Sequence, residues 1–273
     1  MKRYKLMKIY KNILLKIICE LDIEKTGRKN KFENKFYLNY IFRILFYGEY
    51  WNTFYCPECD RSTIRKKFYK WRNIGIFNEA LKRMQSIYYK NRTFKYLFID
   101  SAIIQNINCT ELINYHYKIK TKKTIKLSII CDNNYVVHSH ILSEPKKHDS
   151  KFILPLIKRK KIPLKKFPYL VGDKGYISKK NKYKLKKMGL KLVTPLRKNQ
   201  KNAKQINKKN KKILKKRFKV EALFAILKKT YKRLQLVVDR KIINYNTFLI
   251  MAITCQFIKK NRNDKLSDTM IIK

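Results

Sequence analysis

Residues 214–228 read LKKRFKVEALFAILK, and this stretch predicts an amphipathic helix that carries a charged face beside an apolar one. On a helix with 3.6 residues per turn, Arg217, Glu221 and Lys228 project from nearly one side. A single carboxylate therefore lies between cations at the border of a buried face, and we expect it to have a partner of opposite charge. The adjoining apolar stripe continues beyond the quoted stretch and consists of Val220, Leu223, Phe224, Leu227, Tyr231 and Leu234.

Acidic residues are scarce around this helix. Between Asp149 and Asp239 the chain has only Asp173 and Glu221, whereas residues 197–217 contain eleven Lys and Arg. One interpretation is that each acid is a counter-ion for neighbouring cations. The other is that the acids bind a divalent cation, because ligation by oxygen alone suits Mg²⁺ or Mn²⁺. The scarcity of acids leaves both interpretations open.

The composition indicates a folded protein with a strongly cationic surface. The chain has 273 residues, a formal net charge of +50 and 45% hydrophobic residues, including 19 Tyr and 15 Phe. This length suits one large domain or two unequal ones, and the aromatic content excludes a disordered basic tail. Such a charge attracts nucleic acid first and a membrane surface second, since no amphipathic anchor is evident. Frequent Lys, Asn and Ile also suggest an AT-rich genome, so the charge predicts phosphate binding without identifying a site.

Cysteine spacing and apolar runs argue against a secreted or membrane protein. The cysteines do not have the spacing of a disulfide framework, which predicts reduced thiols in an intracellular protein. A CPEC pair has no second pair at zinc-finger spacing, so a zinc site is not expected there. The longest apolar run, residues 242–258, is interrupted by Asn and Gln and predicts a buried helix rather than a membrane span. The six cysteines are Cys19, Cys56, Cys59, Cys109, Cys131 and Cys255.

The first part of the chain predicts a helical domain. Apolar residues recur at helical spacing in residues 36–45, before a stop at Gly48. Asp60 or Ser62 can cap a second helix, and a turn with Gly75 separates this helix from a third at residues 76–89. Two helices around such a turn are typical of a helix-turn-helix reader of DNA, or of a small bundle that only supports the next domain.

Strands appear from residue 94 onwards. Residues 94–99 predict a strand that ends at Asp100, and residues 169–171 predict one that leads to Asp173. Residues 197–216 contain few apolar side chains and predict a solvated loop or, if ordered, a segment that follows a phosphate backbone. Strands that alternate with helices indicate an α/β domain. The further strands are expected at 124–131, 135–141 and 191–194, and the helices at 149–157, capped by Asp149 or Ser150, and 178–188.

Three acids stand out in this α/β region. Asp100 and Asp173 follow predicted strands, where α/β sheets tend to bind ligands, and Glu221 lies on the quoted helix. Brought together, they would repel one another, and two divalent ions would remove that penalty and form a clamp for phosphodiester chemistry. Arg217 and Lys228 would then hold phosphate. Each acid also has a purely structural alternative: a turn cap at Asp100, a turn before Gly175 at Asp173, and an ion pair with Arg217 at Glu221.

The spacing around the third acid resembles that of the insertion-sequence DDE transposases. The chain is similar to the Tyr–Arg–Glu–Lys signature of that family, because three residues separate Arg217 from Glu221 and six separate Glu221 from Lys228. Leu214 occupies the tyrosine position, so the chain departs from the family at a phosphate-contacting or orienting residue. The Asp-Lys-Gly-Tyr segment at Asp173 and the Phe-Ile-Asp-Ser segment at Asp100 are similar to the family's motifs for the other two acids.

The likeness extends along most of the chain. Residues 126–149 resemble the strand-and-helix region between the first two acids, and residues 40–77 resemble the helical domain that precedes the catalytic one in many of these elements. The resemblance covers residues 35–258. It implies an α/β fold with an RNase H-like mixed sheet and flanking helices, preceded by an all-α domain.

The resemblance also implies a domain organisation, a cofactor and partners. We expect a DNA-binding domain at 1–90, a catalytic domain at 91–260 and a basic, polar tail at 261–273. Asp100, Asp173 and Glu221 would bind Mg²⁺ or Mn²⁺, as two ions, to cut double-stranded DNA at terminal inverted repeats and join it to target DNA. A homodimer in the cytoplasm at the nucleoid, or in a eukaryotic nucleus, is implied. The DNA contacts expected are Arg217, Lys228, Lys174, Arg65, Lys66 and Arg72.

Two other functions stay open. A transposase-derived protein that binds DNA without cutting it would keep the helical reader and the basic surface without metal dependence. A basic RNA-binding structural protein would account for the charge alone, and it would bind arbitrary RNA more tightly than the terminal repeats of an element.

Overall fold

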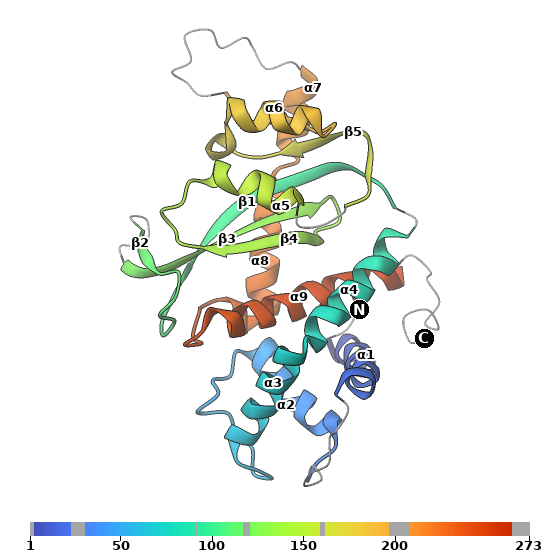
Figure 1. Ribbon diagram of the computed structural model, residues 1–273, viewed down its shortest axis with the longest axis vertical. Helices are drawn as coiled ribbons and strands as arrows, with labels where there is room; N and C mark the ends of the chain where they lie inside the picture. The colour runs from blue at the N-terminus through green and yellow to red at the C-terminus, as the bar shows by residue number, and fades with distance from the viewer. Residues whose placement is uncertain are drawn as a thin grey trace. The chain divides into compact units, whose positions relative to one another are not determined.

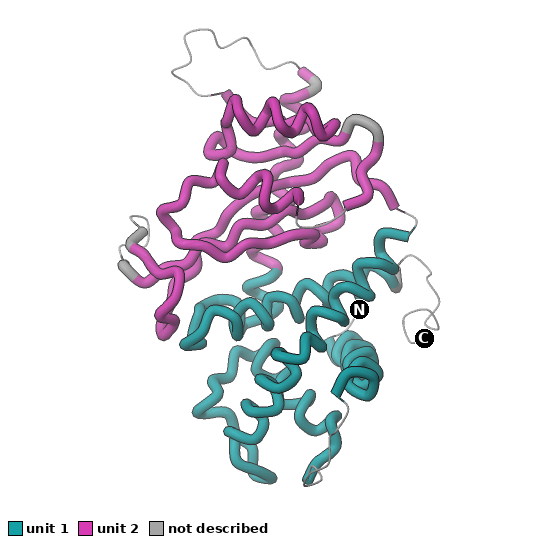
Figure 2. Tube along the Cα trace, viewed as in Figure 1, with its two compact units in different colours: residues 1–90, 227–273 teal, residues 91–226 magenta. Residues whose placement is uncertain are grey.

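The chain forms two compact units in a computed structural model. The structure describes residues 3–22, 31–90, 92–116, 121–158, 162–196 and 208–263. One unit combines residues 1–90 with 227–273, and the other comprises residues 91–226 (Figure 2). The described C-terminal residues from 227 onwards therefore belong to the same unit as the N-terminal helices. The domain boundaries that the resemblance implies remain a prediction.

Helices make up the first unit. Asp60 caps one of them, because its side chain accepts the Ser62 amide at 2.7 Å, and Gly48 ends another, as the sequence predicts. Gly75 has a φ of 91°, a left-handed conformation that glycine adopts without strain, and it joins two helices directly. The helices are α1 (Arg3–Leu21), α2 (Asn34–Tyr47), α3 (Arg61–Ile74), α4 (Ile76–Tyr89) and α9 (Ile242–Asn263), with a short 3₁₀ turn η3 (Lys232–Leu234).

A buried ion pair ties α9 and η3 to the N-terminal helices. Arg233 and Asp239 are 2.8 Å apart, and both side chains are 1% exposed. The Trp51 indole N–H donates to the same carboxylate at 3.1 Å, and the Arg233 guanidinium also donates to the Glu49 carbonyl at 3.0 Å. Phe248 of α9 stacks on Phe68 of α3. Most of residues 242–258 are buried, as predicted, although Ile243 is exposed. No helix in the described ranges is long and apolar enough to cross a membrane.

A mixed six-stranded sheet forms the centre of the second unit (Figure 1). The strand order is β2-β3-β1-β5-β6, and β4 pairs with β3. β1 runs antiparallel to β3 and parallel to β5, which confirms the predicted α/β class. Consecutive residues of β3 such as Ile129, Ile130 and Cys131 are all buried, as expected for a strand covered on both faces. The strands are β1 (Phe94–Gln105), β2 (Asn114–His116), β3 (Thr121–Asp132), β4 (Val137–Ser143), β5 (Leu164–Val171) and β6 (Lys191–Val193).

Helices flank the sheet. Figure 1 shows α5 and α8 on opposite faces of the sheet. The helix predicted to begin at Asp149 or Ser150 is capped by His148 instead, because its ring nitrogen accepts the Ser150 amide. The elements are η1 (Asp149–Phe152), α5 (Ile153–Lys158), η2 (Lys174–Tyr176), α6 (Lys179–Lys187), α7 (Lys208–Lys215) and α8 (Phe218–Thr230).

Two predicted boundaries beside the acids are wrong. β1 continues through Asp100, which pairs with Ile129, so this acid lies within the strand and not at its end. The long antiparallel pairing with β3 outweighs the low strand propensity of aspartate. The helix predicted at 214–228 is broken, because α7 ends at Lys215 and α8 begins at Phe218. Backbone amides at this break bond to carbonyls three residues back, as in a 3₁₀ turn.

The structure describes only part of the two predicted polar segments, residues 197–216 and 261–273. Residues 208–215 of the tract at 197–216 form α7 and bury Ile213, so this part is not a solvated loop. Residues 197–207 lie outside the described residues. The expected tail at 261–273 begins within α9, and residues 264–273 also lie outside the described part of the chain.

Candidate active site

Asp100 projects from the middle of β1 and is largely buried. Its side chain is 17% exposed, one oxygen accepts the Ser101 amide at 2.8 Å, and the other lies 3.2 Å from the Arg217 guanidinium. Burial raises the pKa of Asp100 to about 6, and the charges of Asp173 and Glu221 add to the rise, whereas the Ser101 amide and Arg217 oppose it. Both other predicted acids therefore act electrostatically on Asp100.

Asp173 is the second residue after the end of β5. Its Oδ1 accepts the Gly175 amide at 2.8 Å and caps η2, so the backbone fixes this carboxylate at the strand end. The predicted place of Asp173 at the C-terminal end of a strand is confirmed, and this strand runs parallel to β1 and β6.

Glu221 lies in the first turn of α8, and its side chain is half-exposed. Arg217, in the turn just before α8, forms ion pairs with both Glu221 and Asp100. The guanidinium thus joins the first and third acids, which are far apart in the sequence. It supplies the positive charge that this pair of carboxylates requires.

The acids also have the structural roles that were the alternatives to catalysis. Asp100 caps the Ser101 amide, Asp173 forms the turn before Gly175, and Glu221 pairs with Arg217. Within the described residues, no three His, Cys, Asp or Glu side chains lie close enough together to hold a metal ion as they stand. The donors nevertheless consist of carboxylate oxygens, the type that Mg²⁺ and Mn²⁺ prefer, and a cation would favour the ionised form of the buried Asp100.

A fourth acid, Asp149, lies beside the second one. A Cβ atom on Gly175 would lie 3.0 Å from Asp149 Oδ2 and 3.0 Å from Asp173 Oδ1, so the two carboxylates flank this glycine. The Lys126 ammonium is 3.1 Å from Asp149 Oδ1 and also donates to the Lys147 carbonyl at 2.6 Å. The sequence predicts Asp149 only as a helix cap, since nothing local indicates that residues 149 and 175 meet.

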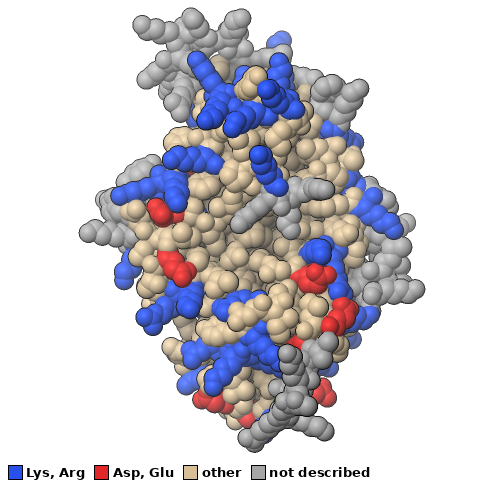
Figure 3. Space-filling model, in the orientation of Figure 1, with Lys and Arg blue, Asp and Glu red and all other residues tan. Residues whose placement is uncertain are grey.

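Two of the predicted DNA contacts, Lys174 and Lys228, lie near the acids along the chain. Lys174 directly follows Asp173, and its side chain is exposed. Lys228 lies about two turns after Glu221 on α8, and burial lowers the pKa of its ammonium group. Figure 3 shows Lys and Arg side chains gathered over α6, whose sequence is KKNKYKLKK.

The other three predicted DNA contacts lie on α3 and differ in the contacts that their side chains make within the protein. Lys66 is exposed, and Arg65 donates weakly to Asn52 at 3.4 Å. Arg72 is held by internal contacts, because its guanidinium donates to Asn73 and Asn244 and lies over the Tyr69 ring. Of the three, Arg72 is therefore the least available to a ligand.

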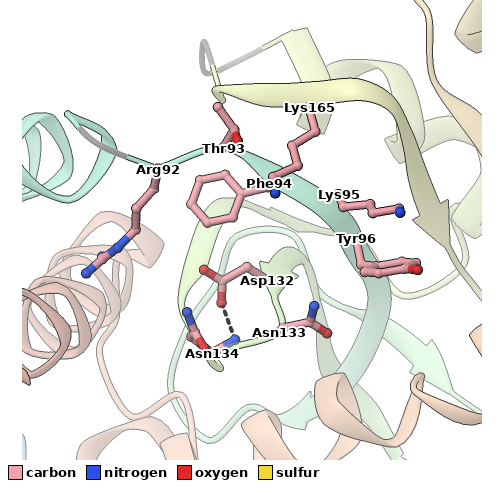
Figure 4. A pocket seen from close by; sticks show the side chains of 9 residues that line it. All are labelled: Arg92, Thr93, Phe94, Lys95, Tyr96, Asp132, Asn133, Asn134 and Lys165. Carbon is pink, nitrogen blue, oxygen red and sulfur yellow. Dashed lines mark hydrogen bonds between the residues drawn. The ribbon is translucent and has the colours of Figure 1, made fainter. Parts of the chain in front are cut away.

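A separate pocket with a volume of about 500 Å³ opens where β1 begins (Figure 4). None of the three predicted acids lines it. Its carboxylate, Asp132, is buried and accepts the amides of Asn134 and Val136, while the exposed charges of the lining include Lys95 and Lys165. The pocket thus presents a cationic surface within the second unit.

The chain is similar to known proteins in both sequence and fold. A family model described as a transposase DDE domain matches residues 97–255. A cryo-EM structure of the piggyBac transposase synaptic complex with hairpin DNA is similar in fold, with a TM-score of 0.55 and 13% sequence identity, over 98% of this chain and 77% of that one. No curated protein matches the sequence. The expected RNase H-like mixed sheet with flanking helices, preceded by helices, is confirmed.

Proposed function

Because a family model matches more than half of its length, the chain belongs to the DDE transposase family, and we propose that it cuts and joins DNA. The proposed reaction is metal-dependent cleavage at the ends of an insertion sequence, followed by transfer of the freed 3′-hydroxyl to target DNA. The observation that carries the proposal is the contact of Arg217 with both Asp100 and Glu221, which brings two of the three acids of the family's motif together.

Asp100, Asp173 and Glu221 are the residues that would hold Mg²⁺ or Mn²⁺, expected as two ions. When bound, such ions supply Lewis-acid activation of the phosphodiester and of the attacking oxygen. Asp100 is largely buried, and the low polarity of its surroundings would strengthen its interaction with a cation. Asp173 and Glu221 supply oxygen donors from a strand end and a helix, so the backbone limits their movement.

Arg217 and the nearby lysines have a separate proposed role, which is to bind phosphate. Arg217 pairs with Asp100 and Glu221 in the free protein, and a guanidinium can instead bind a DNA phosphate through two parallel hydrogen bonds. Lys174 and Lys228 flank the acids along the chain and would bind the DNA backbone near the cut. The helices α3 and α4, with Arg65, Lys66 and Arg72, are proposed to recognise the terminal inverted repeats as part of a homodimer.

A plasmid cleavage assay tests this proposal. A supercoiled plasmid that carries the DNA ends flanking the gene is incubated with Mg²⁺ and with wild type, Glu221→Gln or Glu144→Gln, a surface carboxylate as the matched control. We expect wild type and the control to nick or linearise the plasmid and Glu221→Gln to lose this activity. If wild type and Glu221→Gln give the same background, the enzyme proposal fails.

One observation favours a second candidate function. Arg217 forms ion pairs with two of the acids, so the free protein already places a cation beside them. A protein that binds terminal repeats without cutting would show specific, metal-independent binding in a gel-shift assay and no cleavage. Tighter binding to arbitrary RNA than to these repeats would instead favour an RNA-binding protein.

A further inference from the structure

The turn that carries Asp173 is held by residues from three other parts of the second unit. Gly175 lies between Asp149 Oδ2 and Asp173 Oδ1, and a Cβ at this position would lie 3.0 Å from each oxygen. Such a contact is tighter than most Cβ contacts, so any larger residue would require the two carboxylates to give way by a few tenths of an ångström. Any shift of Asp149 therefore changes the space in which the Asp173 turn is held.

Lys126 fixes Asp149. This lysine lies on β3, its side chain is 8% exposed, and its ammonium contacts both Asp149 Oδ1 at 3.1 Å and the Lys147 carbonyl at 2.6 Å. An ion pair with a nearly buried partner is screened less than a surface pair and holds its geometry better. It also offsets the repulsion between the neighbouring carboxylates of Asp149 and Asp173.

The other end of the turn is attached to the strand of the first acid. Tyr176 is fully buried, and its hydroxyl is 2.8 Å from Ser101 Oγ, which in turn is 2.8 Å from Ser128 Oγ. Ser101 follows Asp100 directly on β1, so the two side chains point to opposite faces of the sheet. This chain of hydroxyl groups links the turn of Asp173 to β1 on the face of the sheet opposite to Asp100.

From these contacts we infer that Asp149, held by Lys126, is a positioning residue for Asp173. It touches neither DNA nor metal in this role, and it sets the place of the Asp173 carboxylate relative to Asp100 by bracing Gly175. Assigning Asp173 to the cation site rests on the proposed function. The bracing of the turn itself does not.

Amide hydrogen exchange of the metal-free protein tests the brace directly. The Gly175 amide donates to Asp173 in the native turn, so it should be protected from exchange. We expect Asp149→Asn and Lys126→Met each to speed the exchange of the Gly175 and Tyr176 amides about tenfold, while the amides of β5 are unchanged. Glu144→Gln, which breaks the exposed pair with Lys147, is the matched control and should change neither. Unchanged exchange at Gly175 in both variants overturns the inference, whatever the protein does to DNA.

Calorimetric titration with Mn²⁺ then tests the consequence for the acids. Asp149→Asn and Lys126→Met should each weaken Mn²⁺ binding about tenfold, and the double variant should be no weaker than the worse single one, because the two residues act as one unit. With DNA, turnover should fall while the affinity for DNA stays at the wild-type value, and Lys126→Arg should restore most of it. Additive losses, or wild-type Mn²⁺ affinity in both single variants, contradict the positioning role.

Gly175→Ala covers the case in which the charge variants unfold. Its methyl group would press on both carboxylates, and we expect the same loss of Mn²⁺ affinity with the fold retained. A folded Gly175→Ala protein that binds Mn²⁺ like wild type overturns the inference. If wild type itself binds no Mn²⁺, the proposed function fails, and the hydrogen-exchange result still decides whether Asp149 braces the turn.

Discussion

Replacing Asp100 by Asn should stabilise the metal-free protein at neutral pH while abolishing its proposed activity. Asn has nearly the same shape and keeps an oxygen that accepts the Ser101 amide. The substitution removes a negative charge from a largely buried position near Asp173 and Glu221. It also removes the ion pair between Asp100 and Arg217. The raised pKa of Asp100 indicates that the cost of this charge exceeds the gain from Arg217.

The magnitude follows from the pKa. Burial, with the two neighbouring acids, raises the pKa of Asp100 to about 6. An unfolded aspartate titrates near 3.9, and each pKa unit corresponds to about 1.4 kcal/mol, so ionised Asp100 costs the folded state roughly 3 kcal/mol. Because the folded pKa is the higher one, wild type loses this stability as the pH rises from about 4 to 6, and the loss is constant above that.

Urea unfolding in EDTA between pH 4 and pH 8 measures the effect. The free energy of unfolding of Asp100→Asn minus that of wild type should increase between pH 4 and 6 by roughly 3 kcal/mol and then stay level. Adding Mn²⁺ at pH 7 should stabilise wild type and leave Asp100→Asn unchanged.

Asp22→Asn is the matched control with the opposite sign. Burial of Asp22 opposes ionisation, but hydrogen bonds from Lys70 and Trp71 and the charge of Lys67 outweigh it, so its pKa is lowered. Its replacement should destabilise the protein by the same amount across pH 4–8, because the lowered pKa lies below 3.8 and this stability is lost only as the pH falls through it. A pH-independent difference for Asp100→Asn, or one that follows the Asp22→Asn curve, refutes the electrostatic account of Asp100.

Three further predictions address other parts of the chain. Asp239→Ala should cost about 3–5 kcal/mol, because it leaves the buried Arg233 without its partner; urea unfolding measures it, and a loss below about 1 kcal/mol contradicts the role of this pair. Lys228→Ala should reduce strand transfer more than Mn²⁺ affinity, and equal losses in joining assays and calorimetry would count against phosphate binding. The double change Arg65→Ala and Lys66→Ala should lower the slope of log affinity for terminal-repeat DNA against log salt by about 1–2, and an unchanged slope places α3 away from the DNA backbone.

Local sequence signals predicted the helical unit well. The helix at residues 76–89 has the predicted bounds, since Gly75 and a regular apolar pattern mark them. Gly48 and Asp60 end and begin their helices as expected, because capping depends on the residue at one position and its immediate neighbours. These features require no knowledge of the rest of the chain.

The sequence singled out the three acids of the candidate site, but it did not predict the tertiary contacts around them. Asp100 was expected at a strand end because aspartate usually interrupts strands, yet pairing with β3 carries β1 on to Gln105. The contact of Asp149 with the Asp173 turn arises because β4, α5 and β5 bring distant residues together around Gly175. Such contacts depend on tertiary structure and leave no periodic signal in the sequence.

A calorimetric titration of Mn²⁺ into wild type, Asp100→Asn, Asp173→Asn and Glu221→Gln tests the central claim that these acids form one cation site. We expect wild type to bind Mn²⁺ and each single variant to bind it about tenfold more weakly or worse, since each removes an oxygen ligand. Wild-type affinity in all three variants, or a loss in only one of them, would show that the acids do not share a cation.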